Sequence, residues 1–190
     1  MIPGLLGLNW PNRLTILRIL LVPVFVISLL YRKNTTALGV FCLASVTDGL
    51  DGFLARAYNQ KTKLGTFLDP LADKLLLSSA YIVMAAVDHL PVWLAVLVMS
   101  RDIIILSGLI TLYLLNEPLH IAPTVLGKVT TFTQISAVFL VLFQQVAGAE
   151  FTLAASGTIF LVALLTVSSG LHYVYIGVNQ LNNGSTRPNY

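Results

Sequence analysis

Long apolar stretches separated by short polar breaks dominate the chain. Each stretch is about 20 residues long, which is the length at which an α-helix crosses the hydrocarbon core of a bilayer. The breaks contain the asparagine, glycine, proline and charged residues that are typical of loops. The pattern predicts six transmembrane helices, at roughly residues 14–31, 36–56, 66–87, 91–115, 125–147 and 151–178.

The two ends of the chain differ from this pattern. Residues 1–13 are short and apolar, contain Trp10, and are interrupted by proline, which is typical of a segment lying in the membrane interface. We expect the six helices to form one domain over residues 14–178. Residues 179–190 are predicted to be a polar C-terminal tail.

Composition supports an all-α integral membrane protein. Hydrophobic residues make up 56% of the 190 residues and charged residues only 10%, whereas soluble domains contain about 25% charged residues. The basic residues are scattered and no basic-aromatic module is present, so we expect no nucleic-acid partner. Cys42 is the single cysteine, which excludes a disulfide within the chain.

The distribution of lysine and arginine predicts the orientation, because cytosolic loops carry an excess of these residues. With the N-terminus inside, the outer side holds only Arg32 and Lys33. The inner side collects Arg13, Arg18, Arg56, Lys61, Lys63, Lys128 and Arg187. We therefore expect both termini and the 57–65 loop on the cytosolic side of the inner or plasma membrane.

Half of the eight acidic residues lie within residues 48–73, between strongly apolar flanks. They are Asp48, Asp51, Asp69 and Asp73, in the pattern D-x2-D-G-x2-A-R-x8-G-x3-D-x3-D. A carboxylate that faces lipid at a helix centre costs roughly 2.5–3.5 kcal/mol. The four aspartates are therefore expected to line a polar cavity and to be held together by positive charge.

The spacing places each pair of aspartates on one helix face. Asp48 and Asp51 are three residues apart near the end of the second helix, and Asp69 and Asp73 are four apart near the start of the third. A short connection should make these helices antiparallel neighbours, so that the acidic faces meet. Ligands that are all oxygen favour hard cations such as Mg²⁺, Mn²⁺ or Ca²⁺. Four carboxylates could hold two ions, an arrangement suited to phosphoryl chemistry.

The other fixed positions fit a diphosphate substrate. Gly52 lacks a side chain beside Asp51, so a ligand can approach the backbone. Arg56 offers a planar donor fork for phosphate. Gly65 precedes the third helix, whose N-terminal dipole favours anions.

A structural alternative is an interhelical lattice of salt bridges in which lysines neutralise the aspartates. Lys61 and Lys63 lie in the predicted loop, and Lys74 points about 100° away from Asp73 on a helix. These basic residues are poorly placed for a lattice, so the spacing favours a functional site.

The complete spacing resembles the signature of the CDP-alcohol phosphotransferase family, in its CDP-alcohol phosphatidyltransferase class I. Asn12, Leu14, Thr15 and Arg18 in NWPNRLTILRI also look like the family's first-helix pattern. The resemblance implies a six-helix membrane fold, usually homodimeric, with a polar cavity open to the cytosol. It implies displacement of CMP from a CDP-linked lipid by an alcohol.

The same resemblance implies roles for individual residues. Asp48, Asp51 and Asp69 would bind Mg²⁺ or Mn²⁺, with two ions in the site, and Asp73 would act as general base and contact the second ion. Gly52 and Arg56 match positions that meet the CDP diphosphate. Positioning and metal electrostatics are expected to contribute more than the basicity of Asp73.

Two acceptors compete within the glycerophospholipid branch, both with CDP-diacylglycerol as donor. Phosphatidylglycerophosphate synthases use glycerol 3-phosphate, and their fifth helix usually begins G-K-x-K-T; here Thr130 replaces the second lysine. Arg101-Asp102 stands where those enzymes often have Arg-Glu. The segments ALGVFCLASVTDGLDGF and SSGLHYVYIG look closer to cardiolipin synthases, so the sequence favours phosphatidylglycerol as acceptor, with glycerol 3-phosphate as the alternative.

Arg101 lies within an apolar helix, where an ionisable residue marks a functional site by default. We expect Arg101 and Lys128 to face the phosphate of the acceptor, with Arg18 contributing from the first helix. The alternative is structural: Arg101 bonded to Asp102 or to carbonyls, and Lys128 extended to the membrane surface. His172 is interpreted as structural, within an aromatic belt.

Proteins of other classes also bury acidic residues in membranes. An ion channel or transporter would show broken helices or an internal repeat, and neither is visible in the sequence. A metal-dependent lipid phosphatase would also use an acidic site. Release of CMP that requires both CDP-diacylglycerol and an alcohol distinguishes the transferase from both.

Overall fold

The computed structural model describes residues 10–57, 63–114, 124–148 and 152–184, and within these ranges every regular element is an α-helix. The helices agree with the predicted stretches to within a few residues at most ends. Their bounds are α1 Trp10–Leu30, α2 Asn34–Ala57, α3 Lys63–Ala86, α4 Val92–Leu114, α5 Val125–Ala147 and α6 Thr152–Gly184.

Three helix ends differ from the sequence prediction by three residues or more. The first helix begins at Trp10 rather than at residue 14, so it includes the last part of the expected interfacial segment. The third helix begins at Lys63 rather than at residue 66, so Lys63 and Gly65 lie within the helix and not in the loop before it. The last helix continues to Gly184 rather than ending at residue 178. At about 1.5 Å per residue its 33 residues extend roughly 50 Å, which exceeds the roughly 30 Å of a bilayer core.

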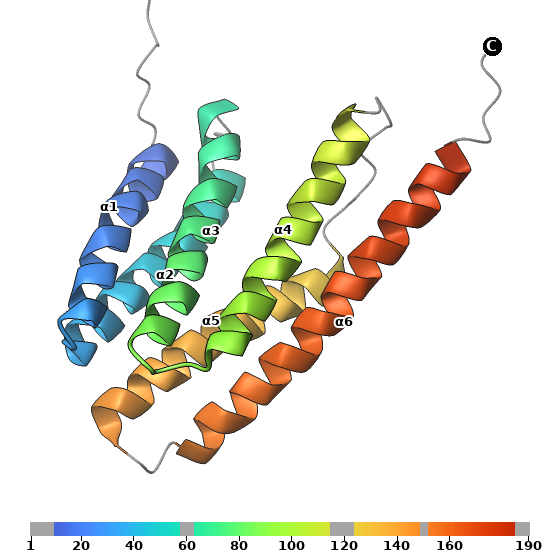
Figure 1. Ribbon diagram of the computed structural model, residues 1–190. Coiled ribbons are helices and arrows are strands. Elements are labelled where there is room, and N and C mark those ends of the chain that lie inside the picture. The colour runs from blue at the N-terminus through green and yellow to red at the C-terminus, as the bar shows by residue number, and fades with distance from the viewer. Residues whose placement is uncertain (1–9, 58–62, 115–123, 149–151, 185–190) are drawn as a thin grey trace, which may run out of the picture.

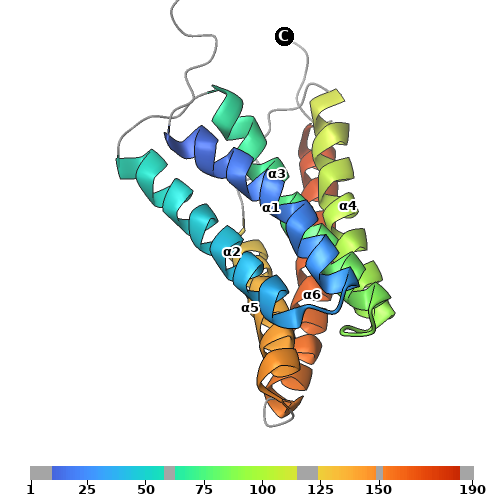
Figure 2. The ribbon, with the colours of Figure 1, turned by 90° about the vertical axis from the view of Figure 1, so that its left-hand side faces the viewer.

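The helices form two groups of three. In the first group α1 packs against both α2 and α3, and in the second α6 packs against both α4 and α5. Contacts of α2 with α5 and of α3 with α4 join the groups. Figures 1 and 2 show that successive helices alternate in direction, so that α1 begins, α2 ends and α3 begins at the same end of the bundle.

Contacts between α2 and α3 are not among the helix pairs that pack closely within the described residues. Instead, α1 lies against both of them (Figure 2). The expected meeting of the acidic faces of α2 and α3 therefore stays a prediction.

The apolar core occupies the half of the bundle where α1 and α3 end and α2 and α4 begin. Fully buried side chains of this core come from all six helices: Phe25, Leu29, Phe41, Tyr81, Met84, Leu94, Val98, Val138, Leu142 and Val162. The rings of Phe25 and Phe41 join α1 to α2 with their centroids 5.7 Å apart. The buried arginines, Arg18 and Arg101, lie outside this core.

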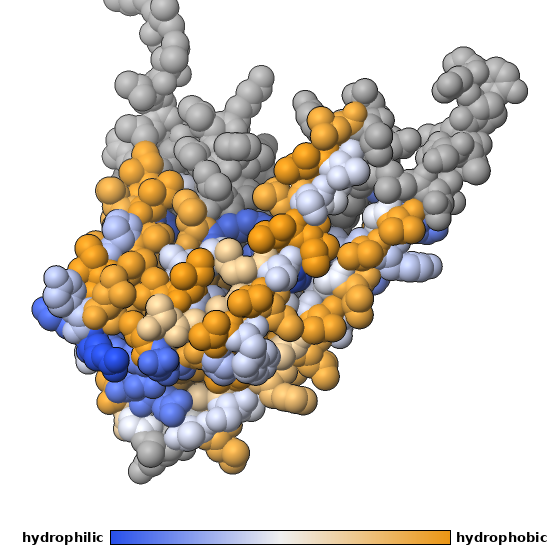
Figure 3. Space-filling view, viewed as in Figure 1, coloured by the Kyte–Doolittle hydropathy of each residue, from blue (hydrophilic) through white to orange (hydrophobic). Residues whose placement is uncertain are grey.

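The outer surface is strongly apolar. Large hydrophobic side chains are exposed on α1, α4 and α6, including Leu20, Ile103, Leu153 and Phe160, and Figure 3 shows this surface as a broad belt over the helices. Monomeric soluble proteins rarely expose apolar patches larger than a few hundred Å². By length and apolarity, two segments of the described chain qualify as membrane-crossing helices: Val125–Ala147 and Thr152–Gln180.

Candidate functional site

The aspartate motif lies at one end of the bundle. Asp48 and Asp51 are in the last turns of α2, and Asp69 and Asp73 are in the first half of α3, as the sequence predicts. Asp48 is the member of this set whose side chain the structure describes. The remaining predicted metal- and CDP-binding residues have side chains outside the described part of the structure: Asp51, Gly52, Arg56, Gly65, Asp69 and Asp73.

Asp48 forms an ion pair across the interface of α1 and α2. An Nη1 atom of Arg18 lies 2.7 Å from Oδ1 of Asp48. The Arg18 side chain is fully buried, whereas 42% of the Asp48 side chain is exposed. Positive charge therefore holds one aspartate of the motif, and the carboxylate remains partly exposed. This donor fits a hard divalent cation.

Arg18 is therefore placed differently from Arg101 and Lys128. It was expected to contribute to the acceptor's phosphate site, but in the structure it contacts a predicted metal ligand. It is absent from the described residues that line the cavity holding Arg101 and Lys128. A role for Arg18 in binding the acceptor directly stays a prediction.

Three basic side chains from three helices line one cavity of about 430 Å³. They are Lys74 on α3, Arg101 on α4 and Lys128 on α5. Thr131 on α5 and Tyr173 on α6 add polar groups to the lining. This volume falls within the range of small-molecule sites, roughly 300–1,000 Å³. No acidic side chain is among the described residues of the lining. The cavity can therefore bind an anionic group on its cationic side, and the rest of its lining includes the apolar side chains of Ile105, Phe132 and Ile135.

Arg101 is held in place by several contacts. One terminal nitrogen donates to Oδ1 of Asp102 at 2.8 Å, and the other donates to the hydroxyl of Ser169 on α6 at 3.1 Å. Only 9% of the residue is exposed. Its Nε is buried and has no hydrogen-bond partner within the described chain. The pairing with Asp102, expected if Arg101 were structural, is therefore present together with a place in the cavity wall.

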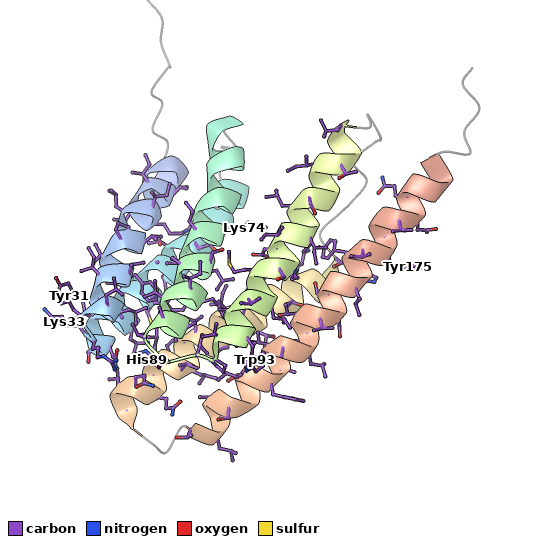
Figure 4. The ribbon with its side chains drawn as sticks, in the orientation of Figure 1. Tyr31, Lys33, Lys74, His89, Trp93 and Tyr175 are labelled. Carbon is purple, nitrogen blue, oxygen red and sulfur yellow. The ribbon has the colours of Figure 1, made fainter. Side chains whose placement is uncertain are left out.

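Lys74 was missed as a member of this site. The sequence analysis placed it about 100° away from Asp73 on the helix and assigned it no role, whereas in the structure Lys74 lines the cavity shared with Arg101 and Lys128. In Figure 4 it lies far from the end of the bundle that holds Lys33 and His89. The sequence signal that could have identified it is a lysine directly after a motif aspartate, at the start of the apolar part of the helix.

Thr130 corrects one argument about the acceptor. The sequence analysis interpreted the threonine at position 130 as the loss of a lysine that binds phosphate. In the structure, Thr130 is fully buried. Its hydroxyl donates to the carbonyl of Leu126 at 2.7 Å and lies 3.3 Å from that of Leu165 on α6. Position 130 therefore packs into the α5–α6 interface, and Lys74 contributes the third cation of the cavity. His172 is exposed and is not among the described residues of the cavity lining.

The fold and these two sites are those of a helical membrane protein with an acidic motif beside a cationic cavity. A family model described as CDP-alcohol phosphatidyltransferase matches residues 8–168. The chain belongs to this family, as the motif resemblance predicted. It is accordingly a membrane transferase of phospholipid biosynthesis, in a family that generally depends on divalent metal ions.

Similar proteins come from several bacteria. A CDP-diacylglycerol--glycerol-3-phosphate 3-phosphatidyltransferase of Bacillus subtilis (strain 168) is 35% identical over 184 residues, covering 87% of this chain and 93% of its own length. A protein of the same name from Escherichia coli (strain K12) is 36% identical over 174 residues, with the same coverage. A probable phosphatidylglycerophosphate synthase of Mycobacterium tuberculosis (strain ATCC 25618 / H37Rv) is 36% identical over 173 residues, covering 87% of this chain and 80% of its own.

Proposed function

We propose that the protein transfers a phosphatidyl group from CDP-diacylglycerol to glycerol 3-phosphate, releasing CMP. The names of the similar bacterial proteins support this acceptor. The cardiolipin synthase activity favoured by the sequence analysis was not confirmed, and its alternative has the better support.

The observation that carries this proposal is the cavity lined by Lys74, Arg101 and Lys128. Glycerol 3-phosphate carries a phosphate monoester with close to two negative charges, which needs several cations when it leaves water. Phosphatidylglycerol carries a monoanionic diester and two acyl chains. Three cations around a small cavity match the first acceptor better than the second.

In the proposed reaction, an acceptor hydroxyl oxygen attacks the phosphorus of the phosphatidyl group. The new P–O bond replaces the bond to CMP, and CMP leaves with the electron pair of that bond. Asp73 accepts the proton of the hydroxyl, which is otherwise a poor nucleophile. Lys74, Arg101 and Lys128 bind the acceptor's phosphate and so orient the hydroxyl toward the donor.

The donor site of this proposal comprises the aspartate motif. Asp48, Asp51, Asp69 and Asp73 would hold Mg²⁺ or Mn²⁺, and the metal would neutralise the diphosphate and the departing CMP. Gly52, Arg56 and Gly65 would contact the diphosphate itself. Arg18 would keep the Asp48 carboxylate aimed at this site through their ion pair.

We also propose six membrane-spanning helices with the site and both termini on the cytosolic side, assembled as a homodimer. The alternating helix directions and the apolar outer surface support several spans. The distribution of basic residues supports the orientation.

The test is to offer purified protein CDP-diacylglycerol with glycerol 3-phosphate, phosphatidylglycerol or glycerol in turn, and to measure CMP release and the lipid product. Of the three acceptors offered with CDP-diacylglycerol, we expect only glycerol 3-phosphate to give rapid CMP release, with phosphatidylglycerophosphate as the lipid product. Asp69→Asn should abolish turnover without unfolding the protein. Faster formation of cardiolipin from phosphatidylglycerol would overturn the proposed acceptor, and metal-dependent ion flux without CMP would overturn the transferase itself.

A further inference from the structure

The side chain of Tyr173 connects the cationic cavity to the start of α5. The Cζ atom of Arg101 lies 5.8 Å from the centroid of the Tyr173 ring, within the range of a cation–π contact. The Tyr173 hydroxyl accepts a hydrogen bond from the backbone N–H of Thr124 at 3.3 Å. One side chain from α6 therefore touches both the arginine of α4 and the first residues of α5.

Thr124 is the residue that caps this end of α5. Its hydroxyl accepts a hydrogen bond from the N–H of Gly127 at 3.0 Å, which satisfies a donor that has no partner inside the helix. Lys128, which lines the cavity, is the next residue after Gly127. The contact with Tyr173 thus reaches the helical turn from which Lys128 extends.

Gly127 leaves the space that Tyr173 occupies. A Cβ atom at this position would lie 2.8 Å from the Tyr173 hydroxyl oxygen and 3.2 Å from Oγ1 of Thr124. Real Cβ atoms essentially never approach another atom as closely as the first of these distances. Any larger residue at position 127 must displace the tyrosine or the cap of α5.

Arg101 depends on the same arrangement. Asp102 and Ser169 hold its two terminal nitrogens, and the Tyr173 ring lies against the guanidinium. These contacts leave the buried Nε without a hydrogen-bond partner in the described chain. A buried donor of this kind costs free energy unless a ligand satisfies it.

We infer that Tyr173 is a positioning residue that sets Arg101 relative to Lys128, and that Gly127 is required because it admits the tyrosine. The inference rests on the proposed function, in which both cations bind the acceptor's phosphate. Phosphate recognition by arginine depends on the direction of its planar donors as well as on charge. Displacing Tyr173 therefore weakens binding of the acceptor while leaving the donor site on α2 and α3 unchanged.

The experiment measures KM for glycerol 3-phosphate, KM for CDP-diacylglycerol and kcat in three variants: Tyr173→Phe, Gly127→Ala and the double variant. Tyr173→Phe loses one hydrogen bond and keeps the ring, so the acceptor KM should rise about three- to tenfold. Gly127→Ala adds the clash, so its acceptor KM should rise about tenfold or more. The donor KM should stay within about twofold in each, the level of an unperturbed contact.

The double variant separates positioning from general damage. Removing the tyrosine hydroxyl removes the nearest atom to the new methyl group. The remaining contacts, at 3.2 Å to Oγ1 of Thr124 and 3.3 Å to Cε2 of the ring, need shifts of only a few tenths of an ångström. We therefore expect the double variant to be no worse than Tyr173→Phe, rather than showing the product of the two effects. Two matched controls should leave the acceptor KM unchanged: Tyr175→Phe, whose ring is exposed, and Gly157→Ala, whose Cβ would meet nothing within 4 Å.

Thermal unfolding in detergent checks that each variant is folded. If Gly127→Ala leaves the acceptor KM unchanged, or if the acceptor and donor KM rise together in the folded variants, the inference is wrong. A multiplicative loss in the double variant would also overturn it. The wild-type acceptor assay keeps this result separate from the proposed function: a different preferred acceptor refutes the function, and the variants are then measured with that acceptor.

Discussion

The ion pair between Arg18 and Asp48 places a fully buried arginine behind a half-exposed carboxylate. Removing the guanidinium leaves the Asp48 carboxylate without its partner at the interface of α1 and α2, at a cost of about 1–3 kcal/mol. Asp48 can still reach water, so the full penalty of an isolated buried charge does not apply. We expect Arg18→Met to lower the free energy of unfolding by about that amount, measured by denaturant titration in mixed micelles.

Arg18→Lys provides the comparison within this pair. Lysine keeps the charge but loses the planar donor fork, so its stability should lie between that of the wild type and that of Arg18→Met. Equal stability of all three proteins would show that the ion pair does not contribute to the fold.

Lys74 is the cation of the cavity that the sequence did not assign. Its loss removes one of three positive charges from around the acceptor's phosphate. We expect Lys74→Met to raise the KM for glycerol 3-phosphate about tenfold, the lower range for a hydrogen bond to a charged group, because the lysine is exposed. Steady-state kinetics measure this change. Lys33→Met, which removes an exposed lysine at the opposite end of the bundle, is the control and should not change this KM.

Lys74 was not assigned to the cavity because a sequence pattern does not show which helices pack against one another. Helical periodicity gives the direction of a side chain about the axis of its own helix. It does not say which helix lies on that side. The contact of α3 with α4, and the cavity between them and α5, depend on packing between distant segments.

At the scale of single elements, the end of α1 departs from the usual chemistry of helix termini. The N–H of Lys33 donates to the carbonyl of Ser28 at 2.8 Å, and the N–H of Arg32 donates to that of Leu29 at 2.9 Å, which is a Schellman motif. Arg32 occupies the left-handed position with φ of 54°, where glycine is preferred. We expect Arg32→Gly to stabilise the protein by about 0.5–1 kcal/mol, measured by thermal unfolding.

Asp88 offers a matched comparison at the end of α3, with φ of 63° and the same pattern of bonds. Aspartate tolerates the left-handed region better than arginine, because its short side chain can bond to the nearby backbone. Asp88→Gly should therefore gain less than Arg32→Gly. A larger gain at position 88 would contradict the explanation by backbone strain.

His89 follows this turn, in the connection between α3 and α4, and its ionisation makes the stability of the protein depend on pH. Burial of its ring lowers its pKa from the ordinary value of 6.5, the positive charge of Arg32 lowers it further, and Asp88 acts in the opposite direction. The unfolded chain therefore binds more protons than the folded one just below pH 6.5. This contribution to stability is present above pH 6.5 and is lost as the pH falls toward the lowered folded value.

We accordingly expect His89→Gln to reduce the loss of stability between about pH 6.5 and 5.5, in the range below the ordinary value. His172→Gln, at an exposed site on α6, serves as the control. Thermal unfolding across this pH range measures the difference. The same pH dependence in His89→Gln and wild type would refute the assignment.

Helix positions were predictable because apolar runs of membrane length are unambiguous. The end of α6 was not, since hydropathy marks the part of a helix that prefers lipid, whereas a helix can continue in water. The apolar pattern ended at residue 178, before Asn179 and Gln180, yet the helix runs on to Gly184. The pairing of Arg18 with Asp48 could not be predicted from the sequence either, because it depends on α1 lying against α2.

At the scale of the whole molecule, the alternating helices separate two ends of different composition. The turn after α1 and the turn after α3 lie at one end, and the predicted inner loop between α2 and α3 joins helix termini at the other. Figure 4 places Tyr31, Lys33, His89 and Trp93 together at the first end. Aromatic residues there fit an interface with water, as does the blue region at that end in Figure 3.

Labelling of introduced cysteines tests the orientation, since Cys42 is the single cysteine and can be replaced by serine. In that background, a membrane-impermeant maleimide should label Lys33→Cys in intact cells, and Lys61→Cys only after permeabilisation. Neither substitution should reverse the orientation. Lys33→Cys removes a positive charge from the expected outer side, and Lys61→Cys leaves Arg13, Arg56 and Lys63 on the expected inner side. The reverse pattern would place the aspartate motif and the cationic cavity on the outer side, away from a cytosolic supply of glycerol 3-phosphate, and would contradict both the orientation and the proposed acceptor.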